Sequence, residues 1–149
     1  MKIFINERCS DMRAAKEFLL KEFSKSGKPY SIKYLPSGQP TLILDGKPSG
    51  YISISHTGAT LVMAFSDKPI GVDIELRDRK TSRIGMDIEN WTKCEAYGKY
   101  LGVGINKEIL KADLPQELVK TFKRGEYVVS VCGEGELEEV VAFIDNGKE

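Results

Sequence analysis

The chain has 149 residues, of which 41% are hydrophobic and 30% charged, and its 22 basic side chains balance its 22 acidic ones. That length suits one ordinary domain with its own core, and the mixed composition excludes a disordered or fibrous protein. Zero formal net charge argues against a general nucleic-acid-binding protein, which normally carries a net basic face. We therefore expect a single domain over residues 1–149 that does not bind nucleic acid.

The cysteines and the apolar segments bear on the compartment. The three cysteines, Cys9, Cys94 and Cys132, lie far apart and form no Cys-x-x-Cys pair, which argues against a disulfide framework and a structural zinc site. The start, MKIFINERCS, lacks the long apolar run of a signal peptide. The uncharged window 48–66 contains glycines, hydroxyl side chains and His56, and is too polar to span a membrane. The sequence predicts a soluble, cytoplasmic protein with no membrane partner.

The first half of the chain predicts one helix followed by short strands. Ser10 is a candidate cap for a helix over residues 11–24, in which apolar residues recur at helical spacing. Glycine and proline turns then separate a series of strand-like runs. These runs cover residues 30–35, 41–44, 51–55, 61–65 and 70–75.

The second half begins with a polar, basic stretch over residues 76–83 that has no clear period. A helix is expected from residue 89 or 90 to residue 101, ended by Gly102 and Gly104. Two later strand patterns, over residues 126–132 and 137–144, predict a second hairpin closed by an acidic turn.

The two halves of the chain resemble each other. Residues 62–67 read VMAFSD and residues 140–145 read VVAFID. Chance similarity between two amphipathic hairpins is the alternative to an internal duplication. A duplication predicts an α+β fold of two similar lobes, approximately residues 1–78 and 79–149, each with a helix packed on an antiparallel sheet. The crevice between such lobes is the expected place for a site.

Paired carboxylates mark one candidate site. In the strand pattern GVDIE at residues 71–75, Asp73 and Glu75 share one face, while the apolar residues between them face the core. Two anions on one face repel each other unless a cation stands between them, and paired oxygen ligands suit Mg²⁺. The alternative is a solvated face of an edge strand.

A second cluster lies on the predicted helix. Glu95 and Lys99 are four residues apart and share a helical face, where an ordinary surface salt bridge is the simplest interpretation. Gly98, however, costs roughly 1 kcal/mol relative to alanine in the middle of a helix. That cost suggests the close approach of another group to Gly98.

Read in order, these clusters resemble the 4′-phosphopantetheinyl transferase superfamily, of the type that activates peptide synthetases. Residues 71–75 are similar to its G-[VI]-D-[IV]-E strand, and residues 91–99 to its W-x-x-K-E-[AS]-x-x-K helix. Residues 54–58 resemble its S-H-[ST]-G hairpin, and residues 101–105 its G-x-G-[LI] exit. The resemblance extends over residues 51–105, with the four motifs in the family's order.

The resemblance implies an activity and a set of site residues. Members move the phosphopantetheine arm of coenzyme A to a serine of an acyl or peptidyl carrier protein and release 3′,5′-ADP. Glu95, or a metal-bound water, would take the serine proton, and Lys99 would bind coenzyme A and stabilise the phosphate charge. Ser55 and His56 would contact the phosphates of coenzyme A. The implied Mg²⁺ ligands are Asp73, Glu75 and Glu95.

The chain also departs from the family pattern. Cys94 stands where the family has a lysine. Gln39 stands in a turn at the position where the family often has a second lysine. Only fifteen residues separate Glu75 from Trp91, whereas peptide-synthetase-type members insert a longer segment that helps to dock the carrier. Two cations and a docking element are therefore missing.

These departures keep other interpretations open. The main alternative is a non-catalytic relative that binds coenzyme A or a partner protein without transferring anything. A thiol enzyme using Cys94 and His56 fits poorly, since no oxyanion-hole motif is evident. If the short form leaves apolar surface uncovered, we expect a homo-oligomer.

Overall fold

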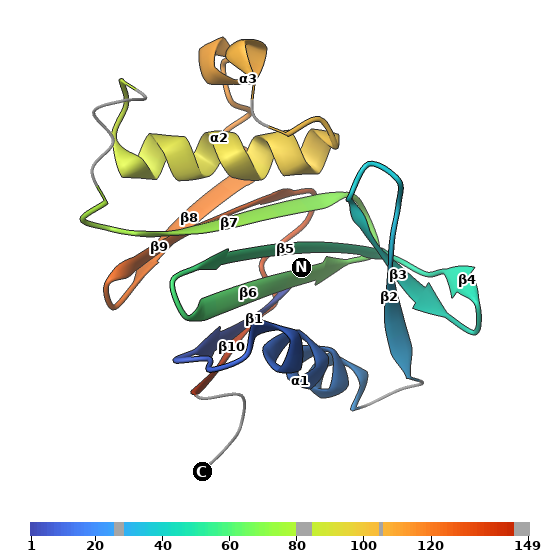
Figure 1. Cartoon of the computed structure of the whole chain (residues 1–149). Helices are drawn as coiled ribbons and strands as arrows, with labels where there is room; N and C mark the ends of the chain where they lie inside the picture. Colours follow the sequence, from blue (N-terminus) through green and yellow to red (C-terminus); the bar gives the residue numbers. More distant parts are fainter. Residues whose placement is uncertain (26–28, 80–84, 105, 145–149) are drawn as a thin grey trace.

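The computed structural model describes residues 1–25, 29–79, 85–104 and 106–144. Within these ranges the fold is mixed α+β, as the sequence predicts, with three small sheets and few helices (Figure 1). None of the helices in these ranges is both long and apolar enough to cross a membrane. The predicted basic stretch 76–83 is described only up to residue 79.

The helices are α1 (Met12–Ser24), α2 (Ile88–Leu101) and α3 (Lys107–Lys111). The strands of the first half are β1 (Lys2–Glu7), β2 (Tyr30–Tyr34), β3 (Pro40–Leu44), β4 (Lys47–Pro48), β5 (Tyr51–Thr57) and β6 (Thr60–Ser66). The remaining strands are β7 (Ile70–Leu76), β8 (Val119–Arg124), β9 (Tyr127–Gly133) and β10 (Glu139–Ile144). The N-cap of α1 is Asp11 rather than the expected Ser10, and the left-handed Gly102 ends α2 as expected.

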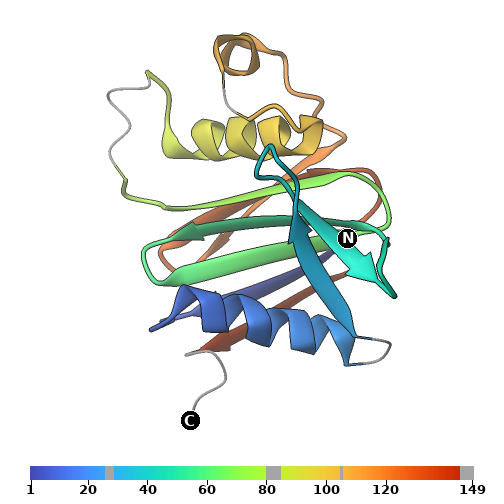
Figure 2. The same cartoon turned by 45° about the vertical axis from the view of Figure 1, so that its right-hand side comes forward.

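Two sheets pack against each other, with a helix on the outer face of each (Figures 1 and 2). One sheet has the strand order β10-β1-β6-β5 and carries α1, and the other has the order β7-β9-β8 and carries α2. The small third sheet, β2-β3-β4, runs beside both layers, and its β2–β3 turn reaches the C-terminal end of α2.

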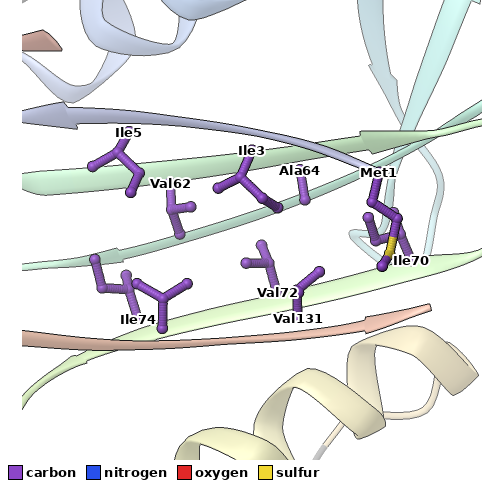
Figure 3. Close-up of a cluster of buried hydrophobic side chains, with 10 residues drawn as sticks. Met1, Ile3, Ile5, Val62, Ala64, Ile70, Val72, Ile74 and Val131 are labelled. Carbon is purple, nitrogen blue, oxygen red and sulfur yellow. The ribbon is translucent and has the colours of Figure 1, made fainter. Parts of the chain in front are cut away.

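Apolar side chains fill the space between the two large sheets (Figure 3). In β7, Ile70, Val72 and Ile74 face this core. Because side chains alternate along a strand, Gly71, Asp73 and Glu75 face α2 instead. The core residues from the other strands are Ile3, Ile5, Val62, Ala64, Val129 and Val131. The expectation that the two carboxylates share the face opposite the core is confirmed.

The predicted hairpin of residues 126–132 with residues 137–144 is wrong. β9 pairs with β7 and β8, whereas β10 lies parallel to β1 at the edge of the other sheet. The hairpin partner of β9 is β8, whose sequence VKTFKR has too many charged residues for a clear strand pattern. Consequently β10, which covers most of residues 140–145, is not the counterpart of β6. Residue 145 itself lies outside the described residues.

Helix α2 packs directly on β7 because Gly71 has no side chain. A Cβ atom there would lie 2.1 Å from the carbonyl oxygen of Ala96 and 2.4 Å from the backbone nitrogen of Tyr100. The close approach expected at Gly98 is confirmed, since a Cβ there would lie 2.6 Å from the carbonyl oxygen of Gly104. These two glycines fix how near the helix comes to the sheet and how its last turn folds back.

We expect Gly71→Ala to destabilise the protein by at least about 2 kcal/mol, because the new methyl group meets the backbone of α2, which cannot move aside cheaply. Urea denaturation of the full chain measures the change. Gly133→Ala is the control and should cost less, since a Cβ there would lie 2.8 Å from the Sδ atom of the Met1 side chain and no nearer than 3.2 Å to backbone, at the carbonyl oxygen of Pro69. Equal losses from both substitutions would contradict this account of the contact.

Candidate active site

Two serine side chains join the large sheets at their adjoining edges. β7 is the edge strand of its sheet, so its outward N–H groups need partners other than a neighbouring strand. The hydroxyl oxygen of Ser53 accepts a hydrogen bond from the N–H of Val72 at 3.0 Å. That of Ser55 accepts one from the N–H of Ile74 at 3.4 Å. β5 therefore holds β7 through side chains at these two positions.

Ser55 also contacts the first candidate carboxylate. Its hydroxyl donates a hydrogen bond to Oδ1 of Asp73 at 2.8 Å. Asp73 is 5% exposed, and its Oδ2 atom is buried with no hydrogen-bond partner among the described residues. Burial raises the pKa of Asp73 to about 7, although the charge of Lys99 and the Ser55 hydrogen bond both oppose the rise. Asp73 is thus not part of a solvated face.

Glu95 and Lys99 of helix α2 act electrostatically on the carboxylate of Asp73. The ammonium group of Lys99 donates a hydrogen bond to the carbonyl oxygen of Ile54 at 2.9 Å. Burial lowers the pKa of Lys99, while the negative charges of Asp73, Glu95 and Glu75 raise it. Burial raises the pKa of Glu95, and the charge of Lys99 opposes that rise. These four side chains act on one another electrostatically and form one group.

Glu75 has a further partner that sequence reasoning missed. Its Oε1 atom lies 2.7 Å from Nη1 of Arg79, and the positive charge of Arg79 also lowers the pKa of Glu95. A turn after β7, in which the N–H of Arg79 donates to the carbonyl oxygen of Leu76 at 3.1 Å, brings the arginine back towards the strand. The only sequence signal was the basic character of residues 76–83.

A cleft of about 470 Å³ adjoins this group. Lys99 lines it, together with Ser53 and Ile54 of β5 and Val103 from the segment after α2. Gln39, from the β2–β3 turn, also lines it, beside Gly102. The cleft therefore opens where three distant parts of the chain meet, with a lysine in its wall.

The structure separates His56 from this group. His56 is exposed and follows Ser55 on β5, so its side chain projects from the other face of the strand, the face on which Ile52 and Ile54 pack towards α1. Cys94 is only 4% exposed, and burial raises the pKa of its thiol, which is the opposite of an activated nucleophile. The structure thus brings together Ser55, Asp73, Glu75, Glu95 and Lys99, and gives no support to a thiol site of Cys94 with His56.

The donor atoms suit a magnesium ion. Among the described residues, no three His, Cys, Asp or Glu side chains are already gathered as a metal site. Mg²⁺ is commonly held, however, by one or two carboxylates, with waters and substrate phosphates completing its shell. The unpartnered Oδ2 atom of Asp73, beside Glu75 and Glu95, offers a carboxylate oxygen of this kind. The residues present therefore fit the ion.

Comparison with models of known protein families finds no match to this chain, and no curated protein matches it either. The geometry of the site therefore carries the functional argument. Of the motif residues singled out in the sequence, Ile105 lies outside the described residues.

We expect the contribution of Asp73 to the stability of the protein to fall as the pH rises from about 4 to about 7. The pKa of Asp73 rises from its usual value of 3.8 to about 7 on folding, so the folded state holds this proton more tightly. The resulting stabilisation is complete below pH 3.8 and is lost as the pH passes 7, at up to about 1.4 kcal/mol per pH unit.

Urea denaturation at a series of pH values measures this effect. Asp73→Asn should reduce the slope and leave the part that comes from the raised pKa of Glu95, whereas Asp67→Asn, at an exposed position, should keep the whole slope. A wild-type slope that survives in Asp73→Asn would show that another group is responsible.

Proposed function

We propose that the protein transfers the 4′-phosphopantetheine group of coenzyme A to a serine of an acyl or peptidyl carrier protein, with Mg²⁺ as cofactor and 3′,5′-ADP as the product that leaves. The observation that carries this proposal is the contact of β7 with α2 at Gly71. It sets Asp73 and Glu75 of the strand against Glu95 and Lys99 of the helix, so the two motifs of the resemblance meet in one partly buried, charged group.

The strand order supports a two-lobed fold of the same family. In one sheet, β1 precedes α1 and pairs antiparallel with β6, the second strand of the β5–β6 hairpin. In the other, β7 precedes α2 and pairs antiparallel with β9, the second strand of the β8–β9 hairpin. We assign one lobe to each set, with the division before β7 rather than near residue 78, because β7 belongs to the second sheet.

In this proposal the carboxylates of Asp73, Glu75 and Glu95 hold the metal. When bound, Mg²⁺ supplies positive charge to the pyrophosphate of coenzyme A. Lys99 binds the phosphate on which negative charge develops, and its partial burial strengthens that interaction. Glu95 takes the proton of the carrier serine, and burial moves its pKa towards the working pH of a general base.

The bonds change at the phosphorus on the pantetheine side. The serine oxygen forms a bond to that phosphorus as the bond to the bridging oxygen of 3′,5′-ADP breaks. The serine proton passes to Glu95, and the leaving nucleotide carries away the bonding electron pair. The chain's own contribution is therefore to bind and orient the phosphates and to accept one proton.

A non-catalytic relative that binds coenzyme A is the second candidate. Cys94 favours it, because a buried thiol occupies the helix position at which the family places a phosphate-binding lysine. The hydroxyl of Ser55 favours it as well, since that group is already engaged by Asp73 and the Ile74 N–H. Retention of three neighbouring carboxylates favours the enzyme, because burying them is costly to a purely structural protein.

Calorimetric titration of coenzyme A into the purified chain, with Mg²⁺ and then with EDTA, tests the binding step without knowledge of the carrier. The proposal expects binding that depends on Mg²⁺. Incubation with coenzyme A, Mg²⁺ and apo carrier proteins then tests transfer by the release of 3′,5′-ADP. Binding without transfer to any carrier would favour the second candidate, and the absence of binding in both titrations would contradict both candidates.

We expect Lys99→Met to weaken coenzyme A binding by about 10- to 100-fold, the loss of one charge-assisted hydrogen bond of roughly 1.5–3 kcal/mol. The same calorimetric titration in Mg²⁺ measures it. Lys93→Met is the matched control, because positions 93 and 99 lie on the same helix about 120° apart around its axis. Equal affinities for the Lys99→Met variant and the wild type would remove Lys99 from the phosphate site.

A further inference from the structure

One arginine forms an ion pair with a carboxylate of the candidate site. Nη1 of Arg79 lies 2.7 Å from Oε1 of Glu75. Among the ion pairs of the described residues, this is the one that involves Asp73, Glu75 or Glu95. The ammonium group of Lys99 is hydrogen-bonded to the carbonyl oxygen of Ile54 instead. Arg79 is therefore the cation in direct contact with the proposed metal ligands.

The two partners differ in their exposure to water. The side chain of Glu75 is 13% exposed, whereas that of Arg79 is 48% exposed. A buried carboxylate needs a positive partner, but a half-exposed guanidinium can leave for water at little cost. The charge of Arg79 also lowers the pKa of Glu95, so the arginine acts on a second proposed ligand as well. Arg79 therefore pairs with Glu75, but its exposed guanidinium can be replaced by another cation.

We propose that Arg79 is a built-in counterion that occupies the place of the divalent cation on Glu75 until the metal displaces it, and that the displaced guanidinium then binds the diphosphate of coenzyme A. The inference rests on the proposed function and adds a positioning residue to it. Guanidinium groups bind phosphate oxygens readily, often through two hydrogen bonds. Arg79 then supplies the diphosphate with a positive charge, which the thiol of Cys94, at the position of a family lysine, does not carry.

This exchange couples the two ligands thermodynamically. A diphosphate that takes the guanidinium leaves Glu75 free for the metal, and a metal that takes Glu75 leaves the guanidinium free for the diphosphate. Each ligand therefore raises the affinity of the other by the same factor. Without Arg79, no side-chain cation competes with the metal for Glu75. The coupling between metal and diphosphate binding that passes through this arginine is then lost.

Arg77 is the matched control. It lies two residues away and carries the same charge, but its Nη1 atom donates to the carbonyl oxygen of Gly125 at 3.0 Å and its backbone N–H to that of Glu126 at 2.8 Å. These contacts tie Arg77 to the β8–β9 turn and not to the carboxylates. A general effect of removing positive charge would appear equally in Arg77→Ala and Arg79→Ala.

The experiment is a titration of Mg²⁺ into the full chain, followed by the amide chemical shifts of β7, with and without coenzyme A. We expect Arg79→Ala to bind Mg²⁺ at least about fivefold more tightly than the wild type when coenzyme A is absent. The gain in Mg²⁺ affinity on adding coenzyme A should shrink in this variant. Arg77→Ala should match the wild type in both respects. In a Glu75→Gln background Arg79→Ala should raise Mg²⁺ affinity by a smaller factor than in the wild type, because only its charge on Glu95 is then removed.

Two other results overturn the inference and are distinguishable from each other. Unchanged or weaker Mg²⁺ binding by Arg79→Ala overturns the role of Arg79 but leaves the proposed metal site standing. The absence of Mg²⁺ binding in every protein, with and without coenzyme A, overturns the proposed function together with this inference.

Discussion

The hydroxyl of Ser55 is the contact on which the site depends, because it serves both the fold and the charge group. It accepts from the N–H of Ile74 and donates to the carboxylate of Asp73. A side chain, rather than a backbone carbonyl, therefore satisfies the edge of β7 at this point. The two sheets meet there without merging into one, so β7 can pack its apolar face on the first sheet and present its polar face to α2.

The electrostatics of the site follow from that geometry. Burial raises the pKa values of Asp73 and Glu95 and lowers that of Lys99, so the protein bears a cost to keep these groups together. With Glu75 and Arg79 included, three carboxylates face two cations. Such a group accommodates a divalent ion better than a third side-chain cation, because the ion can bridge several oxygens and still hold a phosphate. Groups with shifted pKa values beside a cleft are typical of functional sites.

Local patterns in the sequence predicted the parts of the site that depend on one element at a time. Alternation along β7 placed Asp73 and Glu75 on one face, and the cost of Gly98 indicated a close contact that the structure confirms. Contacts set by distant pairing were not predictable in this way. The parallel pairing of β10 with β1 has no local signal, and a one-residue step along β5 turns His56 away from the face that carries Ser55.

The positions at which the resemblance would place two lysines, Cys94 and Gln39, are best understood from where each side chain lies in the fold. Cys94 is buried on α2, so a cation at that position would be desolvated unless a phosphate lay directly against it. Gln39 lines the cleft beside Gly102 and can donate a hydrogen bond, but it brings no charge. The turn after β7 instead brings Arg79 to the carboxylates from the solvent side. On our proposal, the positive charge for the diphosphate comes from this turn as well as from the helix, so the site needs fewer buried cations.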